Sequence, residues 1–361
     1  MNTTAELLID TAAGPLHITT PAPRETWWEL AAQDADCRVT QTPTWLDCLS
    51  DTGAYRDASR LYEFDDGGRI LLPLVSRRRR PRWLDAEESW PADWGIGGPV
   101  VAGDVGPEKA RAVFGDLARR PALQVGLRFR PGDTALWEKA APADFRPEPH
   151  MTQVVNLDGG FGTVWERRFH KRARRDVRRA QREHVEVEVD RTGRLAPVFY
   201  QLYEASIERW ARQQNEPLAL ARWRRRRGFP SQRLSAVAAR LGESCAIWVA
   251  WRDGEPCASI VVLRHGRHAK FWRGAMNREL AHPLKANALL HRLAIEEACE
   301  AGCGCYDMGD STPGSSLASF KAGFGADSWS SPRYFRERLP VSAAERRLRA
   351  AVKRVIRFRD A

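Results

Sequence analysis

Short hydrophobic runs separated by polar and glycine-rich turns predict an alternation of strands and helices in the first half of the chain. Strands are expected at 69–75, 123–129 and 150–157, a helix at 109–117 and a glycine-rich loop at 93–98. The turn Asp158-Gly159-Gly160 follows the last of these strands and is a natural boundary. We therefore expect one domain at 1–157 and a second at 158–361, with 333–361 packing back on the first.

The second half repeats the mixed pattern. Apolar residues at Phe169, Ala173, Val177 and Ala180 recur at helical spacing and predict a helix from Trp165 to about residue 182. Further helices are expected at 195–210, 231–241 and 287–300, a hairpin at 246–251 and 258–263, and strands at 185–189, 269–275 and up to 307. The order of helix, hairpin, strand, helix and strand indicates an α+β fold with mixed sheets.

A last helix is expected after the capping box formed by Ser342 and Glu345. Its apolar residues fall on one side and its cations on the other: Leu348, Val352, Val355 and Ile356 against Arg346, Arg347, Arg349, Lys353, Arg354, Arg357 and Arg359. The favoured interpretation is a helix docked on the body of the protein with a solvated basic face. The alternative is a helix lying on an anionic membrane surface.

The length of the chain, its hydrophobic runs and its net charge limit the classes of protein that fit the sequence. With 361 residues the chain is long for a single core. No apolar run reaches the length of a transmembrane helix, and the first 21 residues do not resemble a secretory signal. The net charge of +11 favours polyanionic partners such as RNA, nucleotides or phospholipid surfaces, although an arginine-rich composition alone would also produce it.

Seven cysteines without framework spacing indicate reduced thiols and a cytoplasmic location. Cys299, Cys303 and Cys305 have no paired spacing or nearby histidine, so no metal site is expected.

The helix expected at 165–182 carries nine cations opposed only by Glu166 and Asp176. A solvated face usually mixes both signs, so contact with a polyanion is favoured over a simple solvated face. The cations are Arg167, Arg168, Lys171, Arg172, Arg174, Arg175, Arg178, Arg179 and Arg182.

The segment 303–326 carries the strongest candidate chemistry. A short buried strand ends at Tyr306-Asp307, a turn of small residues follows, and Phe320-Lys321 stands just before the glycines at 323 and 325. A fixed cation beside an aromatic anchor, with glycines that permit close approach, suits a phosphate-bearing or oxyanionic group.

Motifs of the common enzyme classes are missing from the sequence. There is no P-loop, no Gly-x-Ser-x-Gly elbow, no His-Glu-x-x-His and no Gly-x-Gly-x-x-Gly after a strand. His265, His268, His282 and His291 have no obvious acidic partner, and Asp307 and Asp310 either share a site or form a turn.

The ordered set of segments resembles the FemABX-like branch of the GNAT superfamily, which includes peptidoglycan bridge aminoacyltransferases and related acyltransferases. The resemblance covers most of the chain and is densest in the second half. It rests on 41–45 (Gln-Thr-Pro-Thr-Trp), 97–99 (Gly-Gly-Pro), 150–157, 170–180, 185–187, 272–275 (Trp-Arg-Gly-Ala), the helix from Asn287, 306–309 (Tyr-Asp-Met-Gly) and 320–325 (Phe-Lys-Ala-Gly-Phe-Gly).

The resemblance implies two tandem GNAT-like domains, each a mixed and mostly antiparallel sheet flanked by helices, with an acceptor side and an acyl-donor side. It implies that Phe320 and Lys321 bind the donor and stabilise charge during transfer. The remaining expected roles are donor binding by Trp272, Arg273, Gly274, Asn287 and Asp307, an acceptor cleft near Trp45, Gly97 and Gly98, and RNA or polyanion contact by Arg168, Lys171, Arg172, Arg175 and Arg179.

The sequence also departs from the family's pattern. No cation follows Trp45, Asn215-Glu216-Pro217 stands where the family has an arginine, the long coiled-coil arm is missing, and 278–287 lacks the glycines of an acetyl-CoA pyrophosphate loop. These departures argue against a UDP-linked acceptor and against coenzyme A.

Three functions stay open at this point. The first is transfer of an aminoacyl group from aminoacyl-tRNA to a small amine or peptide, with no bound cofactor. The second is acyl-CoA-dependent N-acyl transfer on the same fold. The third is a non-catalytic protein that binds a polyanion or a membrane on this scaffold.

Overall fold

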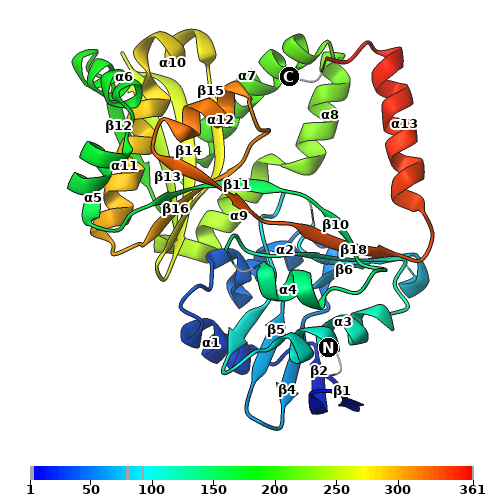
Figure 1. Cartoon of the computed structure of the whole chain (residues 1–361). Helices are drawn as coiled ribbons and strands as arrows, with labels where there is room; N and C mark the ends of the chain where they lie inside the picture. Colours follow the sequence, from blue (N-terminus) through cyan, green and yellow to red (C-terminus); the bar gives the residue numbers. More distant parts are fainter. Residues whose placement is uncertain (1–3, 79–80, 92, 133, 360–361) are drawn as a thin grey trace. The chain divides into compact units, whose positions relative to one another are not determined.

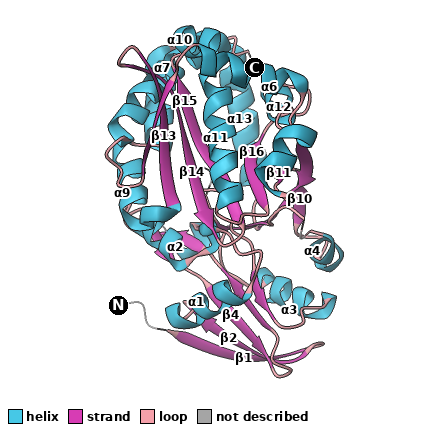
Figure 2. Ribbon diagram, turned by 90° about the vertical axis from the view of Figure 1, so that its left-hand side faces the viewer, coloured by secondary structure: helices cyan, strands magenta, loops and turns pink. Residues whose placement is uncertain are grey.

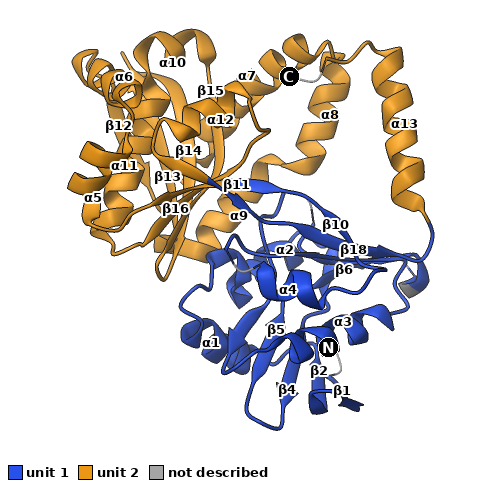
Figure 3. Cartoon of the chain, viewed as in Figure 1, with its two compact units in different colours: residues 1–152, 328–339 blue, residues 153–327, 340–361 orange. Residues whose placement is uncertain are grey.

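The computed structural model describes residues 4–359 except 79–80, 92 and 133. The chain divides into two compact units (Figure 3). Unit 1 comprises Met1–Thr152 and Ser328–Leu339, and unit 2 comprises Gln153–Asp327 and Pro340–Ala361. The division falls just before the expected boundary at 157/158. It assigns the last strand to unit 1 and the segment from residue 340 onward to unit 2.

Within the described residues, unit 1 contains a five-stranded antiparallel sheet and a mixed six-stranded sheet. The first sheet has the order β1 (Ala5–Thr11), β2 (Gly14–Thr20), β4 (Arg60–Phe64), β5 (Arg69–Leu72), β8 (Val100–Ala102). The second has the order β10 (Arg146–Glu148), β18 (Arg333–Glu337), β9 (Gln124–Arg128), β7 (Ala86–Ser89), β6 (Val75–Arg77), β3 (Tyr55–Asp57). The strand expected at 69–75 is split into β5 and β6, because Pro73 lacks the amide that would continue the ladder.

The helices of unit 1 cover its sheets and close its core. They are α1 (Arg24–Gln33), α2 (Pro43–Ser50), α3 (Pro107–Ala118) and α4 (Ala135–Ala140), with 3₁₀ turns at Val39–Gln41 and Arg82–Leu84. Phe114 on α3 lies at the centre of an aromatic cluster, with ring centroids 5.0 Å from Phe145 and 6.2 Å from both Trp137 and Tyr334. Because Tyr334 comes from β18, the late strand is part of the core of unit 1.

A buried charge pair ties β4 to α3. Nε of Arg60 lies 2.7 Å from Oδ2 of Asp116, and the Tyr62 hydroxyl donates to the same carboxylate at 2.9 Å. Replacing Asp116 by alanine should destabilise unit 1 by about 3–5 kcal/mol, because Arg60 would stay buried without its counter-ion. Urea denaturation followed by tryptophan fluorescence measures the loss, and Asp65→Ala in an exposed turn is the matched control. Equal midpoints for the two variants would contradict the prediction.

Unit 2 is built around one mixed sheet. Its strand order is β12 (Glu186–Asp190), β13 (Cys245–Arg252), β14 (Glu255–His265), β15 (His268–Met276), β16 (Cys305–Asp310), β11 (Met151–Asn156), β17 (Ala326–Ser330). The pairs from β12 to β15 are antiparallel, whereas β15 and β16 are parallel. The α+β class and the mixed sheets flanked by helices are therefore confirmed.

Helices cover both faces of this sheet. The helices of unit 2 are α5 (Gly160–Thr163), α6 (Lys171–Arg182), α7 (Ala196–Gln214), α8 (Leu218–Gly228), α9 (Ser231–Leu241), α10 (Arg278–Leu284), α11 (Ala286–Glu300), α12 (Ser316–Ala322) and α13 (Val341–Val355), with a 3₁₀ turn at Gly242–Ser244. Figures 1 and 2 show α9 and α11 on opposite sides of β13 and β14. The apolar side of α6 packs with α11 over the second face, through Ala173, Val177 and Ala180.

The helix expected from Trp165 to residue 182 is interrupted. A π-helical turn covers Val164–Arg168, residues 169 and 170 are extended, and α6 begins at Lys171. The break has a tertiary cause. The Phe169 ring packs against Phe324 at 5.1 Å, and the His170 amide donates to the carbonyl of Gly323 at 2.8 Å. The extended residues thus attach the basic helix to the segment that carries Lys321.

The last helix, α13, differs from the favoured expectation. None of the described residues 341–355 is buried, so unit 2 does not cover the apolar side of this helix. Packing of α13 back on unit 1 stays a prediction. No helix in the described part of the chain is long and apolar enough to cross a membrane.

Candidate active site

The segment that carries Lys321 is held at both ends. β16 is buried through its centre, and α12 follows with its first turn capped by Oγ of Ser315, which accepts from the Ala318 amide at 3.1 Å. After α12, Gly325 has φ 76°, and a Cβ there would lie 2.6 Å from the carbonyl oxygen of Arg168. Only glycine fits this close approach, so the glycine read from the sequence has a definite structural role.

Lys321 is buried, with 2% of its surface exposed. Its Nζ donates to the carbonyl oxygens of Gly309 at 2.8 Å and Asp310 at 2.7 Å, at the carboxyl end of β16. An ammonium has three N–H donors, so these bonds leave one for a ligand. A charge fixed by two backbone carbonyls needs little reorganisation when a negative oxygen forms beside it.

Burial lowers the pKa of Lys321 to about 8, and the nearby charge of Lys270 acts in the same direction. Asp310 and Asp307 oppose the shift. The side chain is therefore mainly an ammonium at neutral pH and loses its charge in mildly alkaline solution.

This pKa sets an alkaline limit on any reaction that needs the ammonium. The charged form is present below the pKa, so the single-turnover rate relative to that of Lys321→Arg should be level up to about pH 8 and then fall about tenfold per pH unit. Lys321→Arg keeps its charge at higher pH and should not show this fall. The measurement is the rate of amide formation against pH at saturating substrates for both proteins. An identical fall in the arginine variant would assign the limit to another group.

Phe320 lies in an aromatic cluster that sequence analysis did not assemble. Its ring is 5.1 Å from Phe324 and 5.6 Å from His291 of α11. Nδ1 of His291 lies 3.2 Å from the Tyr306 hydroxyl. His291 comes from α11 and Tyr306 from β16. Only the packing of these two elements brings the side chains together, and the sequence has no local pattern that predicts it.

His291 is 3% exposed and has its pKa lowered to about 3, first by burial and then by the charge of Lys321. Burial raises the pKa of Tyr306. Both groups are therefore neutral at neutral pH. The wall beside Lys321 is aromatic and uncharged, which keeps the effective dielectric around the ammonium low.

Asp307 has partners inside the protein. Its Oδ2 lies 2.8 Å from Nζ of Lys270, and its Oδ1 accepts from the Gly309 amide at 2.7 Å. Lys270 and Asp307 form the last residue pair between β15 and β16, although both strands continue beyond it. The ion pair thus stands where the two parallel strands stop pairing, next to the carbonyls that hold Lys321.

Trp272, Arg273 and Gly274 lie where the register of β15 shifts. The Trp272 ring is 5.6 Å from the Phe229 ring, and the Arg273 guanidinium lies 5.1 Å from the centroid of the same ring. A Cβ on Gly274 would lie 2.9 Å from Cζ of Phe271. The structure thus groups Trp272 and Arg273 around Phe229 rather than with Phe320, and donor binding by these three residues stays a prediction.

Asn287 is near the start of α11, where Nδ2 lies 3.0 Å from Sδ of Met276 at the end of β15. The preceding segment, expected to replace a glycine loop, forms the short helix α10 capped by Asn277. Lys285 then has φ 58° and separates α10 from α11.

Cations of α6 line a surface hollow of about 360 Å³ together with Lys285. We call this the basic hollow; its lining residues are Arg172, Arg175, Asp176, Arg179, Arg182 and Lys285. Three of the five predicted RNA contacts, Arg172, Arg175 and Arg179, are brought together here. The sequence did not predict Lys285 as a member of this group of cations, because Lys285 lies between α10 and α11 and not on α6.

The field around the basic hollow is positive. The pKa of the neighbouring His282 is lowered, first by Lys285, then by burial and Arg278, with Arg179 adding to the effect and only Asp176 opposing it. An anion placed in this hollow would be attracted by several side chains at once.

The other two predicted RNA contacts lie outside the basic hollow. The guanidinium of Arg168 donates to the carbonyls of Asn156 and Asp158 and so holds the chain after β11. Lys171 is exposed at the first position of α6. Arg168 therefore has a structural task in addition to any contact with a ligand.

The residues predicted for the acceptor side lie in the interior of unit 1. Trp45 is fully buried at 0% exposure, and its indole N–H donates to the carbonyl of Trp94 at 3.0 Å. The Gly98 amide donates to Oγ of Ser89 at 2.6 Å, and a Cβ on Gly97 would lie 2.2 Å from that oxygen. Any contribution of these residues to acceptor binding would come through the loop at 93–98 that they support.

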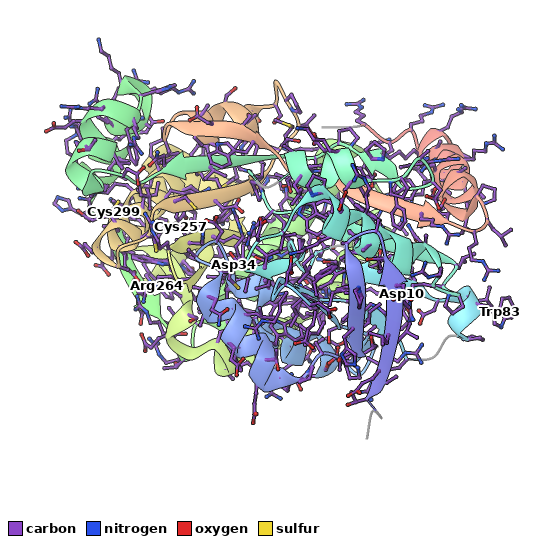
Figure 4. All side chains as sticks on the ribbon, turned by 60° about the horizontal axis from the view of Figure 1, so that its bottom comes forward. Asp10, Asp34, Trp83, Cys257, Arg264 and Cys299 are labelled. Atoms are coloured by element: carbon purple, nitrogen blue, oxygen red, sulfur yellow. The ribbon has the colours of Figure 1, made fainter. Side chains whose placement is uncertain are left out.

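The seven cysteines all lie in the described part of the chain and are free thiols. Cys257 is buried and Cys299 is partly exposed; both are labelled in Figure 4. Burial raises the pKa of each, so neither is an activated thiolate at neutral pH.

Comparison with known proteins agrees with this geometry. The family described as "Acetyltransferase (GNAT) domain" matches residues 167–321, a range that contains α6, the sheet from β12 to β16 and Lys321. This part of the chain therefore resembles a GNAT domain. A sequence search of curated proteins found no match.

Solved structures extend the likeness to most of the chain. FemX is 14% identical with a TM-score of 0.54, over 88% of this chain and 96% of that chain. L-PGS from Bacillus licheniformis is 16% identical with a TM-score of 0.53, over 89% and 95%. A tandem GNAT protein from the clavulanic acid biosynthesis pathway is 11% identical with a TM-score of 0.51, over 93% and 98%. At this level of identity the likeness establishes the fold, and this fold is the one that the resemblance to the FemABX-like branch implied.

Proposed function

We propose that this protein transfers an aminoacyl group from aminoacyl-tRNA to an amine and so forms an amide bond. The observation that carries the proposal is the combination, in one GNAT domain, of a buried ammonium at Lys321 and the basic hollow on α6. The first suits a developing oxyanion, and the second suits a nucleic-acid backbone. The acyl carrier is a substrate, and the reaction needs no bound cofactor.

The chemistry is an aminolysis. The amine nitrogen attacks the ester carbonyl of the charged tRNA, and negative charge develops on the carbonyl oxygen. Lys321 stabilises that charge through its remaining N–H. The C–N bond forms, the ester C–O bond breaks, and the proton lost by the nitrogen ends on the ribose oxygen of the tRNA. An ester is sufficiently activated that positioning supplies much of the rate.

The donor is held by charge rather than by a glycine loop. α10 occupies the segment before α11, and the cations of the basic hollow lie on the adjoining α6 and at Lys285. Four arginines and one lysine around a single hollow are enough to neutralise several phosphates of an RNA strand.

The setting of the reaction is part of the proposal. Seven free thiols support a reducing compartment, which we take to be the cytoplasm. The acceptor is a small amine or a peptide, because the proposed reaction requires only an uncharged primary amine as its nucleophile.

An acyl-CoA donor is the second candidate. The match to a domain described as an acetyltransferase favours it. The same match favours both enzymatic functions over a non-catalytic binding protein.

The deciding experiment supplies a radiolabelled amino acid as charged tRNA over a panel of amines, with and without ribonuclease. We expect labelled amide that disappears when the tRNA is digested beforehand. A parallel reaction contains an acyl-CoA and no RNA. Turnover with acyl-CoA and none with charged tRNA would replace the first candidate by the second.

A further inference from the structure

The helix α13 has an uncovered apolar stripe. Val341, Ala344, Leu348, Val352 and Val355 follow one another at spacings of three and four residues, so they lie along one side of the helix. Leu348 is 66% exposed and Val355 is 82% exposed. A continuous apolar stripe at the surface of a folded protein usually marks a surface that binds something.

The rest of α13 is cationic. Its only carboxylate, Glu345, is 2.6 Å from the guanidinium of Arg349, so it is already paired. The charged residues on the remaining faces are Arg346, Arg347, Arg349, Lys353 and Arg354. We propose that α13 is a membrane-docking helix: the apolar stripe enters the boundary of a lipid bilayer, and the flanking cations bind anionic headgroups.

The length of α13 fits a helix that lies in the plane of the bilayer. Fifteen residues at a rise of about 1.5 Å each give about 22 Å, which is shorter than the hydrocarbon core. Cations occur along the helix from Arg346 to Arg354, so the helix cannot be inserted across the membrane without burying charge. An interfacial position buries the stripe and leaves the guanidinium groups at the headgroups.

The helix is attached to the protein by its end and not by its apolar side. The Asn215 side-chain amide donates to the carbonyls of Ile356 at 3.0 Å and Arg357 at 3.3 Å, and the Arg359 amide donates to the carbonyl of Gln214 at 2.9 Å. These bonds join the segment after α13 to the end of α7. Membrane binding therefore requires no part of unit 2 to unfold.

Membrane docking is a property separate from acyl transfer, so its test does not need an acyl-transfer assay. The full-length protein is sedimented with vesicles of phosphatidylcholine alone and of phosphatidylcholine containing a quarter phosphatidylglycerol. We expect binding to the anionic vesicles at least tenfold tighter than to the neutral ones, weakened by salt. Absence of binding to the anionic vesicles, or equal binding to both, would overturn the proposal.

Two double variants with the same change of charge separate insertion from simple attraction. Leu348→Asp with Val352→Asp places two carboxylates in the apolar stripe, and Ala343→Asp with Ala350→Asp places two on the opposite side. The first should lose vesicle binding by at least tenfold more than the second. Equal losses would overturn insertion of the stripe.

A protein partner is the competing occupant of the stripe. Sedimentation without vesicles shows whether the wild-type protein associates with itself. If the wild-type protein forms a dimer and the variant Leu348→Asp with Val352→Asp does not, a second copy of the chain occupies the stripe. That result would overturn the lipid proposal. Far-UV circular dichroism checks that each variant keeps its helix content. The salt dependence of vesicle binding is measured on the wild-type protein, so it tests the proposal even if a variant loses its helix content.

Discussion

Replacing Lys321 by alanine should lower the single-turnover rate of amide formation by about 10²–10³-fold while the affinity for charged tRNA changes little. Removing one preorganised donor from a developing oxyanion costs about 3–4 kcal/mol in comparable sites. The rate falls rather than the affinity, because the charge that Lys321 stabilises is present only in the transition state. The measurement is a rapid-quench assay at saturating donor and amine.

The result needs two controls because Lys321 also bonds to the carbonyls of Gly309 and Asp310. Lys321→Met keeps much of the side-chain volume and should be as slow as the alanine variant. Lys139→Ala removes an exposed lysine of α4 and should leave the rate unchanged. Full activity of Lys321→Ala in a folded protein would end the assignment.

Charge removal in the basic hollow should have the second largest effect. Arg175→Gln with Arg179→Gln should weaken binding of charged tRNA by about 10²-fold near 0.1 M salt. The slope of log affinity against log salt should become shallower by about two, since two fewer counterions are released. Fluorescence anisotropy of labelled tRNA across a salt series measures both quantities.

The matched control removes two exposed arginines from another helix. Arg111→Gln on α3 with Arg119→Gln directly after it changes the net charge by the same amount. It should leave the affinity within about threefold, because long-range attraction alone is screened at this salt concentration. Equal losses in the two double variants would mean that tRNA responds only to overall charge.

Local signals predicted much of the fold of unit 2. The hairpin expected at 246–251 and 258–263 is formed by β13 and β14, and it turns at Asp253-Gly254, where both residues have positive φ. The helix expected at 287–300 is α11. By contrast, β18 pairs with β9 and β10 from much earlier in the chain, and no local pattern in 333–337 specifies those partners.

The break before α6 shows why a helical period can mislead. Phe169 falls on the apolar stripe of the expected helix, but its ring packs against Phe324, more than a hundred residues away in the chain. Only the tertiary contact decides that residues 169 and 170 are extended. The same limit applies to α13, whose amphipathic pattern fits a docked helix and an exposed one equally well.

The part of the candidate site that lies in one continuous segment was predictable from the sequence. Lys321 and the glycines that follow it stand in a single stretch, so their chemistry was visible in the sequence. His291 could not be paired with Tyr306, because a buried neutral histidine needs no acidic partner and leaves no signature. Lys285 joins the basic hollow only because α6 and α11 pack side by side.

A crystal structure with a stable donor analogue tests the central claim most directly. The analogue is a short oligonucleotide ending in CCA, with the aminoacyl group linked by an amide in place of the ester. The account predicts that its carbonyl oxygen lies at hydrogen-bonding distance, about 3 Å, from Nζ of Lys321, with phosphates in the basic hollow. A carbonyl bound elsewhere, while Nζ contacts only Gly309 and Asp310, would contradict it.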